Sequence, residues 1–372
     1  MSFERPDRRS AKWRTYDADV LPLWIAEMDY PLAPCIAAAL HDAVDRSDTG
    51  YRFAADLPQA LSEFWARRIG WAPDPDRIML IGDVLVGMAE SLRRLSAGAL
   101  VITPPAYPPF FHVAVDLVGR DLVEVPLIPG EGLDFDGLAN AFARPEVTTF
   151  LLGNPHNPTG DIWSADDLRR IAKLARECDV LVISDEIWAP LTMPGKTMTP
   201  YLSLGEELTG PDVALVSASK AFNLAGLKAA QMIAGSDATM ERIRAAIPLE
   251  ISYSTGQFGV IASIAAFRDG DAWLDDTRAQ IASNADLLAK LLAESLPQVH
   301  YTPPEATYLA WLDFRELGLG DDPAAVLLER GRVALSSGPA FGEQGKGWAR
   351  LNLATTPEII SEAVTRMLAA MP

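Results

Sequence analysis

The sequence has few cysteines, few basic residues and no long apolar run, and each scarcity excludes a class of protein. No apolar run reaches roughly 18 residues, so we expect no membrane-spanning helix. The two cysteines, Cys35 and Cys178, lie far apart without paired spacing, which indicates neither a disulfide framework nor a zinc site. The segment Met1–Arg14 is strongly charged and has no apolar stretch before a cleavage site. We therefore expect no secretory signal, and we predict a cytoplasmic protein with reduced thiols.

Basic residues are also scarce relative to acidic ones. The chain has 32 Lys and Arg against 50 Asp and Glu, a formal net charge of −18. Nucleic-acid binding requires a clustered basic surface, so this function is excluded. The acidic residues are spread along the chain, a distribution that favours solubility rather than binding of a cationic partner.

What the chain does have is a large apolar content arranged in short runs. With 372 residues, 49% of them apolar, it can bury a large core and form two domains. Each apolar run is followed by polar or turn residues, which predicts buried parallel strands at Leu100–Thr103, Thr149–Leu152, Val180–Ser184 and Val213–Ser217. Between the second and third runs, Ser164 can cap a helix whose apolar face includes Leu168 and Ile171. Strand, helix and strand at this spacing predict an α/β domain.

The pattern changes after about residue 267. A long helical pattern covers Asp271–Leu296, strand-like segments follow at Tyr308–Phe314 and Ala349–Ala354, and Thr356-Pro357 opens a last helix. Its expected buried stripe is Ile360, Val364, Met367 and Leu368. We predict an N-terminal arm (residues 1–34), a large α/β domain with a mostly parallel sheet (35–267) and a small α+β domain (268–372).

Lys220 is the first candidate for chemistry. It stands directly after the run that ends at Ser217, and ligands of parallel sheets gather beyond the carboxyl ends of strands. The reference pKa of lysine is about 10.4, so bringing it near neutrality takes roughly 4 kcal/mol of environmental bias. A Schiff-base lysine needs that bias because only the neutral amine attacks an aldehyde. The competing interpretation is a surface lysine.

Two further candidates follow neighbouring strands. Asp185 could pair with a pyridinium nitrogen, although it could equally cap the next helix. In the turn Asn154–Gly160, prolines and a glycine hold Asn157 rigidly enough to donate to a phenolate-like oxygen or a carboxylate. His156 in the same turn is better explained by local hydrogen bonds than as a base, because no partner is marked for it.

Arg350 is the fourth candidate. It lies on a strand that otherwise packs into a domain, so it needs an anionic partner, and a carboxylate held by both guanidinium nitrogens fits its geometry. An internal salt bridge is the competing interpretation. Ser217–Lys220 also matches the Ser-x-x-Lys motif of penicillin-recognising enzymes, but the companion Ser-Asp-Asn and Lys-Thr-Gly elements are missing.

The sequence resembles the class I/II aminotransferase superfamily of fold-type I pyridoxal 5′-phosphate (PLP) enzymes. Within it, the chain is most similar to the cystathionine β-lyase, or C–S lyase, branch. The resemblance covers nearly the whole chain and rests on Pro22–Asp29, Thr103–Phe111, Asn154–Gly160, Ser184–Ile187, Ser219–Leu227 and Ala306–Asp313. The aromatic-proline stretch and the Ala-Thr-Tyr-Leu-Ala-Trp run are characteristic of the lyase branch.

The resemblance implies roles for the residues around the ring of the cofactor. Lys220 would be the Schiff-base lysine and proton shuttle, Asp185 would pair with the ring nitrogen, and Asn157 would bond the ring hydroxyl. Tyr107 would stack on the ring, and Arg350 would hold the substrate carboxylate.

The resemblance also implies a phosphate site and a homodimer. Ser217, Lys228 and the backbone amides of Val84 and Leu85 at a helix start would hold the phosphate. Tyr51 matches a tyrosine that reaches the phosphate of the neighbouring subunit, which implies a homodimer with shared active sites. Trp24, in the arm, would help to shape the substrate pocket.

Three positions depart from the family pattern. Trp188 stands where relatives have tyrosine or histidine, so the tuning of the ring oxygen is open. Lys228 replaces an arginine and keeps the charge without the fork. Asp83 stands where the lyases have glycine, and we expect its carboxylate to face away from the phosphate.

The resemblance implies β-elimination: loss of a thiolate from an S-substituted cysteine such as cystathionine, giving pyruvate and ammonia. Transamination of a small amino acid is the alternative, because its early steps are the same. A PLP-binding regulator is a third hypothesis from another class, since such folds can be reused for binding.

Overall fold

A computed structural model describes residues 7–371, so the first six residues of the expected arm and residue 372 lie outside the description. The α-helices are α1 (Ala11–Arg14), α2 (Pro34–Asp45), α3 (Leu57–Arg68), α4 (Val84–Arg94), α5 (Pro108–His112), α6 (Phe135–Phe142), α7 (Ala165–Glu177), α8 (Glu206–Thr209), α9 (Ala218–Ala221), α10 (Asp237–Ala246), α11 (Leu249–Tyr253), α12 (Gln257–Asp269), α13 (Asp271–Ser295), α14 (Pro323–Gly331) and α15 (Pro357–Ala369). The strands are β1 (Leu21–Pro22), β2 (Ile78–Ile81), β3 (Ala99–Ile102), β4 (Leu122–Glu124), β5 (Val147–Gly153), β6 (Leu181–Asp185), β7 (Val213–Val216), β8 (Ala230–Ala234), β9 (His300–Tyr301), β10 (Leu309–Asp313), β11 (Val333–Ala334), β12 (Ser336–Ser337) and β13 (Trp348–Asn352). No helix within residues 7–371 has the length and apolarity needed to cross a membrane.

A seven-stranded sheet forms the larger part of the molecule, in the order β2-β8-β7-β6-β5-β3-β4. Only β8 runs antiparallel to its neighbours β2 and β7, so the sheet is mostly parallel, as predicted. The four apolar runs predicted as strands are β3, β5, β6 and β7. They are buried along almost their whole length because helices cover both faces of the sheet.

The two faces of the sheet bury different side chains of the same strand. On β6, Val182 packs in one apolar cluster with residues of α3, α6, α7 and α12. Its neighbours Leu181 and Ile183 pack in a second cluster with residues of α4, α5 and α10. This alternation is the period-two geometry of a strand, and it gives three layers: helix, sheet, helix. The predicted helix after Ser164 is α7, and its capping box pairs Ser164 with Asp167.

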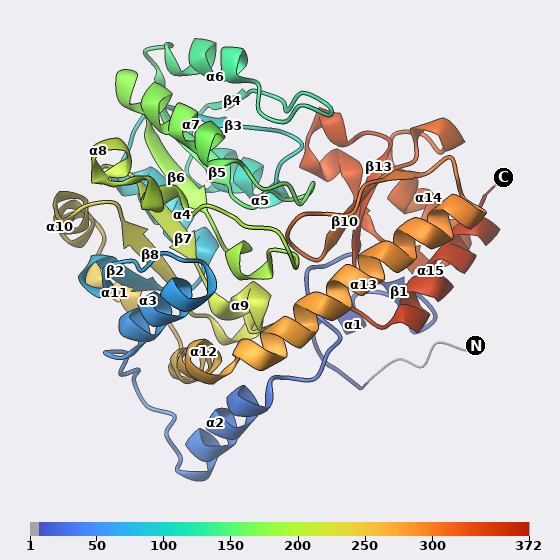
Figure 1. Ribbon diagram of the computed structural model, residues 1–372, viewed down its shortest axis with the longest axis horizontal. Coiled ribbons are helices and arrows are strands. Elements are labelled where there is room, and N and C mark those ends of the chain that lie inside the picture. The colour runs from blue at the N-terminus through green and yellow to red at the C-terminus, as the bar shows by residue number, and fades with distance from the viewer. Residues whose placement is uncertain (1–6, 372) are drawn as a thin grey trace.

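A second, antiparallel sheet lies beside the first, in the order β12-β13-β10-β9 (Figure 1). The long α13 runs from α12 toward the helices α14 and α15 of this region (Figure 1). The predicted elements after residue 267 are therefore confirmed as α13, β10, β13 and α15. One detail was wrong: Ile360, Val364 and Met367 are buried on α15, but Leu368 is 47% exposed. Leu368 follows Met367 directly, about 100° around the helix from the buried stripe.

The N-terminal segment crosses to the second sheet. Leu21 of β1 pairs in parallel with Val333 of β11, and the backbone of Leu23 bonds to Ala334 and Asn352. The chain then returns along residues 24–29 toward the large sheet. This path places the arm between the two sheets, while the division at residues 34 and 267 stays a prediction.

Candidate active site

Six strands of the large sheet, β2 to β7, end at the same edge, and the candidate residues follow five of them. β3, β5, β6 and β7 are mutually parallel, and β2 has their direction because both β2 and β7 are antiparallel to β8. The segments that follow these strands carry the candidate residues. Lys220 is on α9 directly after β7, Asp185 is the last residue of β6, and Asn157 follows β5. Tyr107 follows β3, and α4 begins at Val84 after β2.

These segments enclose a cavity of about 240 Å³. Eight of the residues selected from the sequence line it: Val84, Leu85, Tyr107, Asn157, Asp185, Lys220, Lys228 and Arg350. The other lining residues are Ile25, Ala26, Asp83, Ile187, Trp188, Ser219 and Ala225. The structure thus brings together side chains from both sheets and from the arm, although they are up to 325 residues apart in sequence (350 minus 25).

Lys220 presents its amine to this cavity. Its Nζ donates a hydrogen bond to the carbonyl oxygen of Ala26 in the arm, at 3.2 Å, and lies 5.6 Å from the ring centroid of Trp188. Burial, reinforced by the nearby positive charge of Arg350, lowers the pKa of Lys220 to about 8. This is the bias that a lysine needs to act as a nucleophile near neutral pH, and it was predicted from the position of Lys220 after the strand.

Asp185 supplies the buried carboxylate of the site. Its Oδ1 accepts a hydrogen bond from the backbone N–H of Ile187 at 3.2 Å. Burial raises the pKa of Asp185 to about 6, although this N–H and the charge of Lys220 act in the opposite direction. A buried carboxylate with so little hydrogen bonding favours a cationic ligand, because a cation would compensate its desolvation.

Arg350 is the buried cation of the site, with 7% of its surface exposed. Its guanidinium donates to Asn157 Oδ1 at 2.8 Å, to Ser336 Oγ at 3.1 Å and to the Trp24 carbonyl oxygen at 3.4 Å. Within residues 7–371 no carboxylate lies within 4.0 Å of it, so it takes part in no salt bridge there. Burial lowers the pKa of Arg350 to about 10. The internal salt bridge left open by the sequence is therefore absent from this part of the chain.

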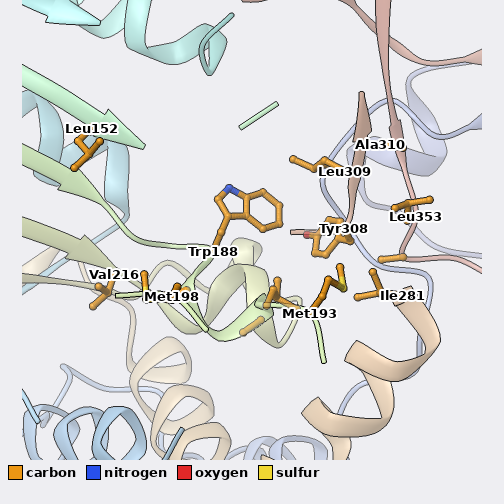
Figure 2. Close-up of a cluster of buried hydrophobic side chains, with 14 of the residues drawn as sticks. Leu152, Trp188, Met193, Met198, Val216, Ile281, Tyr308, Leu309, Ala310 and Leu353 are labelled. Atoms are coloured by element: carbon orange, nitrogen blue, oxygen red, sulfur yellow. The ribbon is translucent and has the colours of Figure 1, made fainter. Parts of the chain in front are cut away.

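Two aromatic side chains, Trp188 and Tyr107, line the cavity that holds Lys220. Trp188 lies between the strand ends of the large sheet and β10 of the second sheet (Figure 2). Its ring meets that of Tyr308 edge-on, with centroids 4.8 Å apart, and the Tyr308 hydroxyl donates to the same Ala26 carbonyl as Lys220, at 3.0 Å. Burial raises the pKa of Tyr107 to about 12, so its hydroxyl stays protonated.

Asp83 and Lys228 form an ion pair at another part of the cavity wall. Asp83 Oδ2 lies 2.8 Å from Lys228 Nζ, and Asp83 Oδ1 accepts from the Val86 N–H at 2.9 Å, which caps α4. This differs from the expectation that the carboxylate faces away. The pair joins residues 145 positions apart, which a motif comparison along the chain cannot foresee.

Three of the selected residues do not line the cavity. The Ser217 hydroxyl is buried and donates to the Ala229 carbonyl oxygen at 2.7 Å, whereas Ser219 does line the cavity. Trp24 contributes its carbonyl oxygen to Arg350, and Tyr51 is fully exposed to solvent. The roles expected for these three residues stay predictions.

The sequence also left some features unmarked and assigned others correctly. The Ala26 carbonyl was missed, because a backbone acceptor has no residue signature.

His156 makes the expected local bond, with Nδ1 2.9 Å from the Thr159 hydroxyl. In residues 7–371 no group of three or more His, Cys, Asp or Glu side chains is suited to a metal ion.

Comparison with known proteins confirms the resemblance. The family described as aminotransferase class I and II matches residues 18–367. A Mycobacterium leprae protein, provisionally named a cystathionine beta-lyase, is 43% identical over 384 residues, covering 97% of this chain and 94% of that protein. Cystathionine beta-lyase PatB of Bacillus subtilis is 32% identical over 387 residues, covering 100% of both chains. The crystal structure of a Corynebacterium diphtheriae protein, provisionally described as a PLP-dependent beta-cystathionase, matches with a TM-score of 0.92 and 34% identity, covering 97% of this chain and 95% of that one. The chain belongs to the class I and II aminotransferase family.

Proposed function

We propose that the protein is a PLP-dependent C–S β-lyase that cleaves cystathionine or a related S-substituted cysteine to a thiol, pyruvate and ammonia. One observation carries the proposal. A lysine amine with a lowered pKa lines the same cavity as a buried arginine that has no carboxylate partner among residues 7–371. The lyase names of the similar proteins select the reaction among those that such a site supports.

The residues of the cavity fit PLP. The cofactor has an aldehyde, a ring nitrogen, a ring hydroxyl and a phosphate, and the cavity offers an amine, a carboxylate, an amide and a cation beside a helix N-terminus. Asp185 is a buried carboxylate that would keep the ring nitrogen protonated. The positive nitrogen would in turn compensate the desolvation of the carboxylate. When bound, the cofactor supplies an electron sink for the carbanion that forms when the substrate loses its Cα proton.

Lys220 has two tasks in this proposal. Its neutral amine would hold the cofactor through the aldehyde, and the same amine would take up the Cα proton of the bound substrate. The Ala26 carbonyl, which accepts from Nζ, holds the amine on the side of the cavity where the arm and the two sheets meet. A pKa of about 8 leaves a substantial neutral fraction near physiological pH.

Other side chains bind and orient. Arg350 holds the substrate carboxylate with both guanidinium nitrogens, and Asn157 and Ser336 already fix its orientation. Tyr107 stacks on the cofactor ring, a contact worth about 1 kcal/mol beyond its buried area. The Asn157 amide oxygen accepts from Arg350, which leaves the amide nitrogen as the group that would donate to the ring hydroxyl. Lys228 and the backbone amides of Val84 and Leu85 would hold the phosphate, and Ser217 would join them only if its hydroxyl turned from the Ala229 carbonyl oxygen.

The proposal includes a homodimer and a cytoplasmic location. Phe53, 79% exposed, lines a surface depression with Leu249 and Tyr253, and Tyr51, two residues before it in the chain, is fully exposed. Exposed large apolar side chains of this kind are typical of a surface that a partner covers, and they support Tyr51 as a contact to a second subunit. The two free cysteines, Cys35 and Cys178, fit a reducing compartment.

Replacing the amine tests the function. We expect Lys220→Ala to lower thiol and pyruvate release from cystathionine by at least about 1,000-fold, because covalent binding and proton transfer are both lost. Borohydride should then trap no PLP on the chain. Lys173→Ala, which removes a lysine that is 74% exposed, is the matched control and should keep full turnover.

Two results would contradict the proposal. Full turnover by Lys220→Ala would remove Lys220 from the mechanism. Turnover by the unmodified protein that requires a 2-oxo acid and releases no thiol would instead establish transamination, the alternative left open by the sequence.

A further inference from the structure

Asp83 has the two contacts that a bound anion would make at its position. As the N-cap of α4, it accepts a hydrogen bond from the first turn of the helix through Oδ1, at 2.9 Å from the Val86 nitrogen. Its other oxygen, Oδ2, lies 2.8 Å from the ammonium of Lys228. A helix N-terminus and a lysine are the donors with which proteins bind phosphate groups. In this structure a carboxylate of the chain itself uses both.

The Asp83–Lys228 pair belongs to the same cavity as Lys220. Val84, Leu85 and Ser219 line this cavity as well. The backbone of Lys228 is fixed there, because its carbonyl oxygen accepts from the Gly256 N–H at 2.9 Å, so the ammonium can move only by side-chain rotation. The Asp83 side chain is 33% exposed, so solvent reaches it. If it turned away from the cavity, it would lose both of its contacts.

We propose that Asp83 is an internal anion that competes with the cofactor phosphate and thereby weakens cofactor binding. This inference rests on the proposed function, since it concerns how the chain receives PLP. A phosphate that enters must either displace Asp83 from Lys228 and from the helix end, or remain beside a carboxylate of the same sign. Both outcomes reduce affinity for the phosphate but not for the rest of the cofactor.

The effect is specific to the charge at this one position. Asparagine has the same shape, is an equally good N-cap and can still accept from the Val86 N–H, but it carries no charge. Asp83→Asn therefore keeps the start of α4 and releases Lys228 for the phosphate. We expect the variant to bind PLP about tenfold more tightly than the unmodified protein, the change that one additional charge-assisted contact gives.

The experiment titrates the full-length chain with PLP and, separately, with pyridoxal, and measures adduct formation by absorbance. Pyridoxal has the same aldehyde and ring but no phosphate, so Asp83→Asn should leave its dissociation constant within about twofold of the unmodified value. Inorganic phosphate should compete with PLP more effectively in the variant. None of these measurements depends on turnover.

A second carboxylate offers a matched control. Asp134 caps α6 in the same way, accepting from the Gly137 N–H at 2.8 Å, but it does not line the cavity. Asp134→Asn should leave the affinities for PLP and for pyridoxal unchanged. A change there equal to that of Asp83→Asn would overturn the inference, because the effect would then come from the loss of an N-cap charge in general.

The remaining outcomes separate this inference from the function. If Asp83→Asn binds PLP as tightly as the unmodified protein, or more weakly, then Asp83 does not compete with the phosphate, and weaker binding would make it a residue that positions Lys228. If neither protein forms an adduct with PLP or pyridoxal, the proposed function itself fails. Tighter binding of both ligands by the variant would also overturn the inference, because it would not involve the phosphate.

Discussion

Besides Lys220, two basic side chains line the cavity, and their surroundings differ. Arg350 is 7% exposed and donates its hydrogen bonds to neutral oxygens, whereas the Lys228 side chain is 58% exposed and is paired with Asp83. A buried cation without a counter-charge destabilises a fold, because its desolvation is not compensated. Its presence is therefore explained by a ligand that brings the missing charge. Lys228 needs no such explanation, since it already has a partner and solvent.

We therefore expect Arg350, rather than Lys228, to bind the substrate. An α-amino acid carries a carboxylate, the group that matches the guanidinium of Arg350. The carboxylate of Asp83 already stands in the corresponding place beside Lys228. Arg350 and Lys228 thus differ in their charge surroundings before any ligand binds. The affinity for a dicarboxylate or for phosphate should therefore change differently when each of the two residues is replaced.

Of the two cations, Arg350 should have the larger effect on turnover when it is removed. We expect Arg350→Ala to lower kcat/KM for cystathionine by about 100-fold or more, mainly through a higher KM, because the substrate carboxylate loses a buried charge-assisted pair. Arg350→Lys keeps the charge without the fork and should recover part of the loss. Steady-state assays of thiol release measure both values.

The control for this prediction is Arg144→Ala. Arg144 is 50% exposed and pairs with Glu146, and it does not line the cavity, so its loss should leave both constants unchanged. An unchanged KM in Arg350→Ala would contradict the comparison, since Arg350 would then be a structural cation like any other.

Much of this fold could be read from the sequence because parallel strands buried on both faces give unbroken apolar runs. β6 (Leu181–Asp185) and β7 (Val213–Val216) were located in this way, and the residues that follow them then marked the site. Lys220, Asp185 and Arg350 were identified because a charged side chain at a strand end, or on a packed strand, conflicts with its surroundings unless a ligand compensates it.

The rest could not be read because it depends on backbone paths and on pairs distant in sequence. Ser217 and Ser219 stand two residues apart in one motif, and only the fold shows that Ser217 bonds to Ala229 while Ser219 lines the cavity. The Ala26 carbonyl oxygen accepts from Lys220, which lies 194 positions away in the sequence. An alanine side chain gives no sign that its backbone oxygen is an acceptor. The pairing of Asp83 with Lys228 depends in the same way on the return of β8 beside β2.

The charge of Arg350 should also affect the pH dependence of Lys220. Because burial and the charge of Arg350 lower this pKa to about 8, the rate of adduct formation with pyridoxal should rise tenfold per pH unit below about pH 8 and level off above it. The sign follows from the amine, which is protonated and unreactive below its pKa. Arg350→Met removes one of the two causes, so the midpoint should move to higher pH.

Stopped-flow absorbance over a pH series measures this midpoint, with Lys220→Ala as the blank for the ionisation of pyridoxal itself. A midpoint close to the ordinary lysine pKa of 10.5 in the unmodified protein would show that the amine is not desolvated. An identical midpoint in Arg350→Met would show that the charge of Arg350 does not reach Lys220, and the contrast between the two cations would lose its electrostatic consequence.

The smallest expected effect concerns the stability that the Asp83–Lys228 pair contributes. In a double-mutant cycle of Asp83→Asn and Lys228→Met, followed by urea unfolding without cofactor, we expect a coupling free energy of at most about 1 kcal/mol at low salt, because both partners contact solvent. The coupling should fall by about half or more at roughly 0.5 M salt, where the Debye length is only a few ångströms. A coupling of about 2 kcal/mol or more that salt does not change would mean that the pair is effectively as buried as Arg350. Phosphate binding would then be too weak to displace Asp83 from Lys228. That result would remove the distinction between the two residues, because Lys228 would then be committed to the fold and only Arg350 would remain for a ligand.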